Sequence, residues 1–247
     1  MRTYLCLCLV ALIASTGLGE LPKLPVDDQR LSISTLVRED IFAGWRAGNT
    51  ERLGRAERNL EKLLESRPDR RAVSLAWLGG VRFNQALLAL ESDNREEFER
   101  LYKETQALYS EATEIGAKDI VVAVVVGGGY AVLADRLPEE YQEEAWTHAF
   151  DGYQKVWAVQ GAYVDKLPSH IGGELLAGIA QSAARLENQT VLDQTLDKII
   201  EVLPETRYAQ VAKEWKQNPE SATTGKIICK SCHTRGRLAA RIKAMEK

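Results

Sequence analysis

The residues best suited to chemistry lie near the end of the chain, where Cys229, Cys232 and His233 form a Cys-x-x-Cys-His motif. This is the spacing at which a haem is attached covalently, because the two thiols add to the porphyrin vinyl groups and the imidazole becomes the proximal iron ligand. Two intervening residues allow a single turn to present both thiols to one edge of the ring. The motif therefore predicts one covalently bound haem c, with iron ligated by His233.

Little else in the sequence competes for this motif. The other cysteines, Cys6 and Cys8, lie in an N-terminal segment that we expect to be removed, and the chain has only three histidines. A zinc site needs four ligands, and no second cysteine pair is present to complete one. A disulfide or a thiol redox pair between Cys229 and Cys232 is the alternative that the spacing leaves open.

Residues 1–19 have the composition of a secretory signal peptide. Arg2 supplies the positive start, residues 4–14 are apolar, and small residues precede a cleavage site that we expect before Glu20. The apolar run is short for a bilayer span, so we expect an exported protein, periplasmic or secreted, with membrane attachment only if the signal stays uncleaved. Export suits covalent haem attachment, which in bacteria takes place outside the cytoplasmic membrane, and it suits a disulfide equally.

The overall composition is that of an ordinary soluble protein, with 45% hydrophobic and 27% charged residues. A formal net charge of −3 implies no broadly basic surface. Because nucleic-acid binding depends on such a surface, we expect no nucleic-acid partner.

Apolar residues recur at intervals of three and four from about residue 34 to residue 217, as expected for amphipathic helices. Turn residues such as Gly48-Asn49 and Pro68-Asp69 separate the periodic stretches. At another break Asp93, with Glu96 three residues later, predicts a capping pair at a helix start. The sequence therefore predicts an all-α fold.

The first helix of each successive pair carries a small or apolar residue followed by glycine, where a neighbouring helix must approach closely. These doublets are Ala43-Gly44, Leu78-Gly79, Val126-Gly127 and Ala177-Gly178. With Tyr130 after the third doublet, and Pro68 and Pro204 after the second helices, the pattern resembles the tetratricopeptide repeat (TPR). The resemblance covers residues 34–217 and implies a solenoid of helical hairpins whose groove binds protein partners. A plain helical bundle is the alternative.

Two stretches within this region have more than one interpretation. Residues 120–126 are rich in β-branched side chains and run into Gly127-Gly128-Gly129, as a strand before a phosphate loop does. Because no Gly-Lys-Ser/Thr follows and no second strand pattern exists, we predict a helix hidden between neighbours. The aromatic residues between 146 and 163 belong either to the core or to a groove that holds a peptide, a partner or the haem. They are Trp146, Phe150, Tyr153, Trp157 and Tyr163.

The chain offers three candidate residues for the second axial ligand of the iron, and water or a ligand from a partner subunit are the alternatives. Met245 follows the motif, but a helix that rises about 1.5 Å per residue has difficulty in rounding the porphyrin edge within so short a tail. His170 and His148 in the helical region are the other two candidates.

The sequence thus predicts a TPR-like solenoid with a short C-terminal haem-binding tail. Its predicted parts are residues 1–19 (signal peptide), 20–33 (N-terminal lead), 34–217 (helical repeats), 218–226 (linker) and 227–247 (haem attachment tail).

The function expected from these parts is electron transfer or haem-linked sensing within an envelope complex, with a protein partner in the repeat groove and a redox partner for the haem. The alternative is a protein-binding module without haem. We expect no enzyme, because no set of residues is typical of acid-base catalysis, and peroxidase-like activity at an open iron site is a weaker third interpretation.

Overall fold

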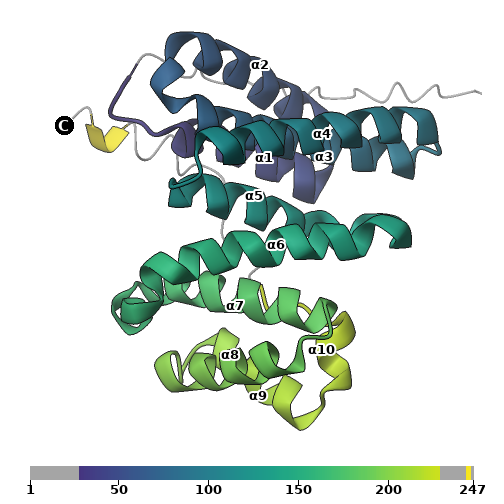
Figure 1. Cartoon of the computed structure of the whole chain (residues 1–247). Coiled ribbons are helices and arrows are strands. Elements are labelled where there is room, and N and C mark those ends of the chain that lie inside the picture. The colour runs from purple at the N-terminus through teal and green to yellow at the C-terminus, as the bar shows by residue number, and fades with distance from the viewer. Residues whose placement is uncertain (1–27, 229–242, 246–247) are drawn as a thin grey trace, which may run out of the picture.

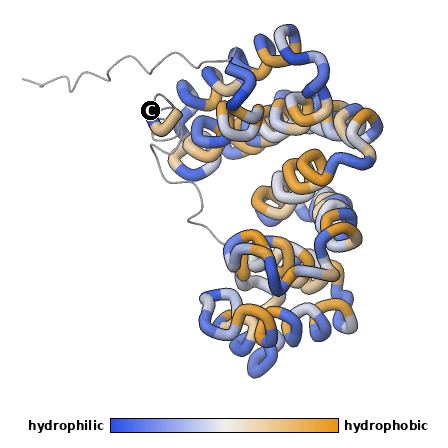
Figure 2. Tube along the Cα trace, turned by 90° about the vertical axis from the view of Figure 1, so that its left-hand side faces the viewer, coloured by the Kyte–Doolittle hydropathy of each residue, from blue (hydrophilic) through white to orange (hydrophobic). Residues whose placement is uncertain are grey.

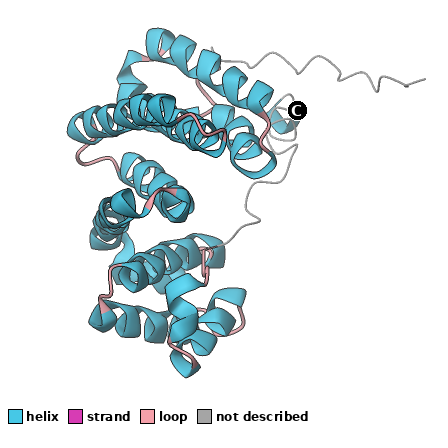
Figure 3. Cartoon of the chain, turned by 90° about the vertical axis from the view of Figure 1, so that its right-hand side faces the viewer, coloured by secondary structure: helices cyan, strands magenta, loops and turns pink. Residues whose placement is uncertain are grey.

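The computed structural model describes residues 28–228 and 243–245. Within these residues every regular element is a helix and no strand occurs (Figure 3). The prediction of an all-α fold is therefore confirmed.

Consecutive helices pair as antiparallel hairpins, α1 with α2, α3 with α4, α5 with α6 and α7 with α8, and α9 packs on α8 (Figure 1). Short 3₁₀ helices occupy three of the connections, at Pro68–Arg70, Ala134–Arg136 and Gly161–Lys166. The α-helices are α1 (Ile33–Ala47), α2 (Thr50–Ser66), α3 (Arg71–Glu91), α4 (Arg95–Ile115), α5 (Ile120–Leu133), α6 (Glu139–Gln160), α7 (Ser169–Arg185), α8 (Gln189–Val202), α9 (Arg207–Gln217) and α10 (Glu220–Thr224).

Polar side chains at the turns fix where the helices begin. The side-chain amide oxygens (Oδ1) of Asn49, Asn94 and Asn188 each accept a hydrogen bond from a backbone N–H in the first turn of the following helix. The predicted cap at Asp93 is wrong by one residue. Asp93 adopts a left-handed conformation with φ of 57°, which ends the turn, and Asn94 then caps α4.

The four glycine doublets lie where helices approach closely, as predicted. An added Cβ at Gly44 would lie 2.9 Å from Leu53 of α2, and one at Gly79 would lie 2.5 Å from the ring of Tyr109 in α4. An added Cβ at Gly127 of α5 would lie 3.1 Å from the Cα atom of Gly152 in α6. The fourth glycine, Gly178 of α7, differs in that it faces back to the preceding hairpin, to the ring of Tyr153 in α6.

An aromatic cluster joins the second hairpin to the third. The ring centroid of Phe83 in α3 lies 5.6 Å from that of Tyr102 in α4 and 5.5 Å from that of Tyr130 in α5. Tyr141 of α6 extends the cluster, with its centroid 5.2 Å from that of Tyr102. Tilted and edge-on contacts at these distances are the favourable geometry for aromatic pairs, so the cluster fixes how the hairpins stack.

The stretch after Ile120 forms α5, so its prediction as a helix is confirmed. The helix is not hidden on every side, because Val121 and Val124 are 41% and 46% exposed. Residues 68–91, which contain α3, are also long and apolar enough to cross a membrane, but most of this stretch is buried inside the helical stack, as in a core helix.

The hairpins stack into a curved array. Viewed from the side, the array has the outline of a C, with α1 to α4 at one end, α7 to α10 at the other, and α5 and α6 set back between them (Figure 2). The concave side of this C therefore exposes α5 between two flanking walls.

Candidate functional site

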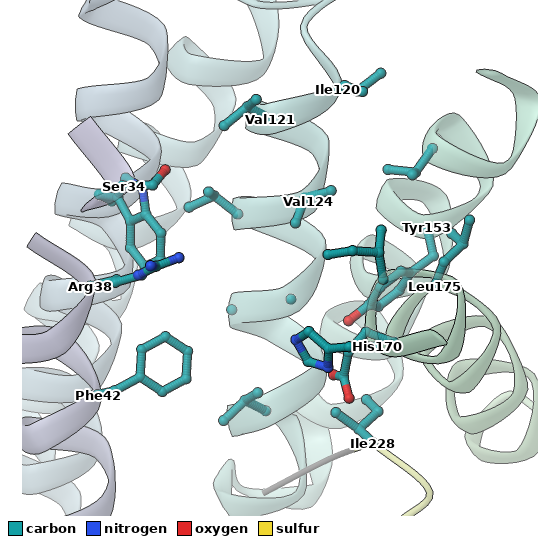
Figure 4. A pocket seen from close by; sticks show the side chains of 18 of the residues that line it. Ser34, Arg38, Phe42, Ile120, Val121, Val124, Tyr153, His170, Leu175 and Ile228 are labelled. Atoms are coloured by element: carbon teal, nitrogen blue, oxygen red, sulfur yellow. The ribbon is translucent and has the colours of Figure 1, made fainter. Parts of the chain in front are cut away.

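A cavity of about 380 Å³ lies on the concave side, with α1 and α7 as facing walls and α5 between them (Figure 4). This volume falls within the range of about 300–1,000 Å³ that is usual for small-molecule and cofactor sites. The lining side chains that matter below are Arg38, Phe42 and Trp45 from α1, Val121 and Val124 from α5, and His170 and Ile171 from α7.

The cavity wall is mainly apolar. Val121, Val124 and Ile171 all line it, and they are among the few large apolar side chains that are exposed in the described part of the chain. At Gly128 the nearest atom to an added Cβ would be the Tyr153 hydroxyl oxygen at 3.8 Å, so the missing side chain leaves open space. Exposed apolar side chains that gather in one hollow typically mark a binding site.

Polar groups enter the cavity from its two walls. Arg38 extends from α1, while His170 and Glu174 stand one turn apart on the same face of α7. Glu174 is held in place because the Tyr208 hydroxyl donates a hydrogen bond of 2.6 Å to its carboxylate.

Two further polar groups of the cavity are tyrosine and tryptophan side chains. Burial, together with the nearby charge of Glu174, raises the pKa of the Tyr153 phenol, so Tyr153 presents a neutral hydroxyl. The indole N–H of Trp45 is buried and has no hydrogen-bond partner among the described residues. Because a buried donor without an acceptor costs free energy, the Trp45 N–H is an unsatisfied donor in this wall.

The chain returns to the cavity after α10. Ile227 is fully buried, and Ile228 is 8% exposed and forms part of the cavity wall. Their backbone N–H groups donate to the side-chain oxygen of Gln181 in α7, at 3.2 and 3.4 Å. The residue that follows Ile228 in the sequence is Cys229.

Within residues 218–226, which are predicted to be a linker, Glu220–Thr224 form α10, and this helix packs against α7 and α9. Ala222 is buried, and Arg185 of α7 donates hydrogen bonds to the carbonyl oxygens of Ala222 and Gly225, at 2.7 and 2.9 Å. The polar composition of this segment suggested an extended tether, whereas its few apolar side chains and its backbone carbonyls bind it to the array.

Arg185 is itself held by an ion pair with Asp135, at 3.0 Å, and Lys226 of the returning segment lies 3.1 Å from the same carboxylate. Burial alone would raise the pKa of Asp135, but the hydrogen bond and charge of Arg185, reinforced by Lys226, lower it overall. The carboxylate is therefore charged at neutral pH and links α7, the loop after α5 and the C-terminal segment.

The predicted haem ligands are placed as follows. Cys229, Cys232 and His233 lie outside the described residues. His170 lines the cavity. Met245 packs on the core, where its carbonyl oxygen is 3.5 Å from the Arg30 guanidinium, and it is not among the cavity-lining residues.

The third histidine, His148, is not among the residues that line the cavity. It stacks on Tyr130, with ring centroids 4.9 Å apart, and Glu144 lies 3.6 Å from its imidazole. Of the aromatic residues between 146 and 163, Trp146 is a core side chain and Tyr153 lines the cavity. Tyr153 is also a buried core side chain, so core packing is confirmed for both residues, while a groove that holds a peptide, a partner or the haem stays a prediction.

Comparison of the chain with protein-family models, with curated proteins and with solved structures finds no significant match. The chemistry of the site thus has to be judged from its own residues. Among the described residues, no group of three or more histidine, cysteine or acidic side chains could hold a metal ion unaided.

The donors present fit a haem, for which the porphyrin supplies most of the iron ligands. The cavity offers apolar walls for the faces of the ring, an imidazole for the iron and an arginine for the propionates. Sequence reasoning missed Arg38, Gln181 and Arg185, which carry no local signal. The unbroken apolar run at α5 was one signal for the cavity, because a helix that is apolar on every face must cover something, and the aromatic stretch that contains Tyr153 was another.

Proposed function

We propose that this protein is an exported, TPR-like scaffold that carries one covalent haem c and serves electron transfer or haem-linked sensing in an envelope complex. Cys229 and Cys232 are the attachment points, and His233 is the proximal iron ligand. The observation that carries the proposal is the position of Ile228. This residue is buried in the wall of an apolar cavity, and the Cys-x-x-Cys-His motif begins with the next residue.

The attachment chemistry needs only the two thiols. Cys229 and Cys232 would hold the haem through two thioether bonds, one to each vinyl group, and this addition would consume no oxidant because the thiol proton would go to the other vinyl carbon. When bound, the haem supplies a one-electron redox centre. The chain contributes an apolar cavity that excludes water from the ring and a cation for its carboxylates.

The scaffold part of the proposal rests on the hairpin stack. Four helical hairpins with close glycine contacts form a curved array with a concave side, which is the arrangement that helical-repeat proteins use for partners. A haem held on this side would be presented to whatever protein the array binds.

The test is to produce the full-length protein in a bacterial host with and without its cytochrome c maturation machinery. We expect haem staining on a denaturing gel, and a pyridine haemochrome spectrum typical of thioether-linked haem, only when the machinery is present. Cys229→Ala and Cys232→Ala should each reduce the number of thioether bonds, and the double variant should lose the stain. A colourless wild-type protein that contains a Cys229–Cys232 disulfide would instead support the alternative, a protein-binding module without haem.

A further inference from the structure

We infer that the cavity between α1 and α7 is the seat of the haem and that His170 is the second axial ligand of its iron. This inference rests on the proposed function and assigns it a place in the fold. It concerns residues that the attachment motif does not contain, so it can fail while covalent attachment is confirmed.

The chain reaches the cavity wall immediately before the attachment motif. Gln181 fixes the backbone N–H groups of Ile227 and Ile228, so the chain is anchored at the α7 wall immediately before the motif. Since consecutive Cα atoms are about 3.8 Å apart, a haem bonded to Cys229 is tethered within a few residues of that wall. The cavity is an apolar hollow next to this anchor.

His170 is the side chain in the cavity that is best suited to ligate iron. His170 belongs to the same wall as Ile228, and its imidazole extends into the cavity (Figure 4). No methionine or cysteine occurs among the described residues that line the cavity. The Tyr153 hydroxyl is a poor competitor, because a phenol that stays protonated has lost the charge that makes phenolate an iron ligand. The imidazole is thus the best nitrogen donor in the cavity.

The surroundings of the His170 imidazole also suit an iron ligand. Ligating histidines usually have a carboxylate or carbonyl beside them that orients the ring and raises its basicity. Glu174 stands one turn after His170, and the hydrogen bond from Tyr208 fixes its carboxylate. The α7 wall therefore combines a donor nitrogen with an immobilised carboxylate.

The facing wall suits the remaining features of the ring. Arg38 and Phe42 extend from α1 toward the cavity, one a guanidinium that pairs with carboxylates and the other an apolar ring (Figure 4). Between the walls, Gly128 leaves bare backbone where a side chain would intrude. A flat apolar ring with two carboxylates at its edge matches this set of groups.

The experiment compares ferric wild-type protein, matured with haem, with His170→Ala and with the control His148→Ala. We expect wild type and the control to give the optical and electron paramagnetic resonance spectra of a low-spin iron with two nitrogen ligands. His170→Ala should keep its covalent haem on a denaturing gel, change to a high-spin spectrum, and return to low spin when imidazole is added. An unchanged low-spin spectrum in His170→Ala would overturn the assignment.

A second variant tests the seat without touching the ligand. Gly128→Phe places a ring in the open space of the cavity, and circular dichroism checks that its helices remain folded. We expect this variant to lose the low-spin spectrum while it retains covalent haem. If both variants behave like wild type, the haem lies elsewhere.

The inference remains testable if the proposed function fails. Should wild type carry no covalent haem, the apoprotein is titrated with haemin and the absorbance change of the bound form is followed. Binding that His170→Ala and Gly128→Phe both weaken at least tenfold would support the cavity as a haem site. Binding of the same strength in all three proteins, or none in wild type, would refute it.

Discussion

Removal of the Arg185 side chain should release the segment that leads to the motif. Arg185 is nearly buried, with 10% of its side chain exposed, and it joins four acceptors: both oxygens of Asp135 and the carbonyl oxygens of Ala222 and Gly225. Its guanidinium also lies 5.5 Å from the centre of the Trp146 ring. Arg185→Leu keeps the apolar stem and removes all of these interactions.

The expected loss of unfolding free energy is about 3 kcal/mol. Removal of one partner from a buried ion pair costs ~3–5 kcal/mol, and the lower end applies because the Asp135 side chain is 22% exposed and retains Lys226. Carbonyl oxygens left without a donor contribute about 1 kcal/mol each where water cannot reach them. If the segment detaches, water can reach these carbonyl oxygens and part of their cost is recovered, so the loss of unfolding free energy stays close to about 3 kcal/mol.

Urea unfolding measures the total loss, and amide hydrogen exchange over residues 222–228 shows whether the segment detaches. Arg95→Leu is the matched control. Arg95 is also an ion-paired arginine, with Glu99 and Glu140 as its partners, but about half of its side chain is exposed, and exposed pairs contribute little. A double-mutant cycle with Asp135→Asn should give a coupling energy of ~0.5–3 kcal/mol. If Arg185→Leu loses no more stability than Arg95→Leu, and exchange is unchanged, the segment is not held in the way described.

Three further outcomes are expected. Because the pKa of Asp135 is lowered in the folded protein, the contribution of its carboxylate to the free energy of unfolding is fully present above about pH 4 and is lost as the pH falls through the folded pKa. The free energy of unfolding of Asp135→Asn should lack this acid-dependent loss. The same pH dependence in the variant and in wild type would contradict the prediction. Gly178→Ala should lower the free energy of unfolding by ~1–3 kcal/mol, since the added methyl group would lie 2.2 Å from the Tyr153 ring. In the control Gly54→Ala the methyl group would lie 3.4 Å from its nearest neighbour and should stabilise α2 by ~0.5–1 kcal/mol. Equal denaturation midpoints for the two variants would refute this prediction. Ile227→Ala should cost ~2–5 kcal/mol of unfolding free energy, and a negligible change would show that Ile227 is not core.

The helices could be predicted from the sequence because their signals are local. Asn49 and Asn188 are turn residues that also cap the next helix, and the apolar period holds on either side of them. The glycine doublets were predicted for the same reason, because a glycine inside an apolar helix indicates close packing before its partner is known. The sequence does not identify the residue that Gly178 packs against, which is Tyr153 of the preceding hairpin and not a residue of α8.

The cavity could not be predicted, because it depends on contacts between residues that are distant in the sequence. Arg38 and His170 face each other across α5 only once all four hairpins have stacked. The returning segment shows the same limit. Its composition predicts a tether, yet Gln181 and Arg185, which lie one turn apart on α7, supply an acceptor and a donor for its backbone. No pattern within residues 218–226 reveals these partners.

The central proposal for this protein is that the chain carries one haem through Cys229 and Cys232. Intact-mass spectrometry of the exported protein, purified under denaturing conditions from cells with active cytochrome c maturation, measures this directly. We expect the mass of the polypeptide plus one haem, and the polypeptide mass alone for the Cys229→Ala/Cys232→Ala variant. A wild-type mass that equals the polypeptide, lowered only by the formation of a disulfide, would contradict it.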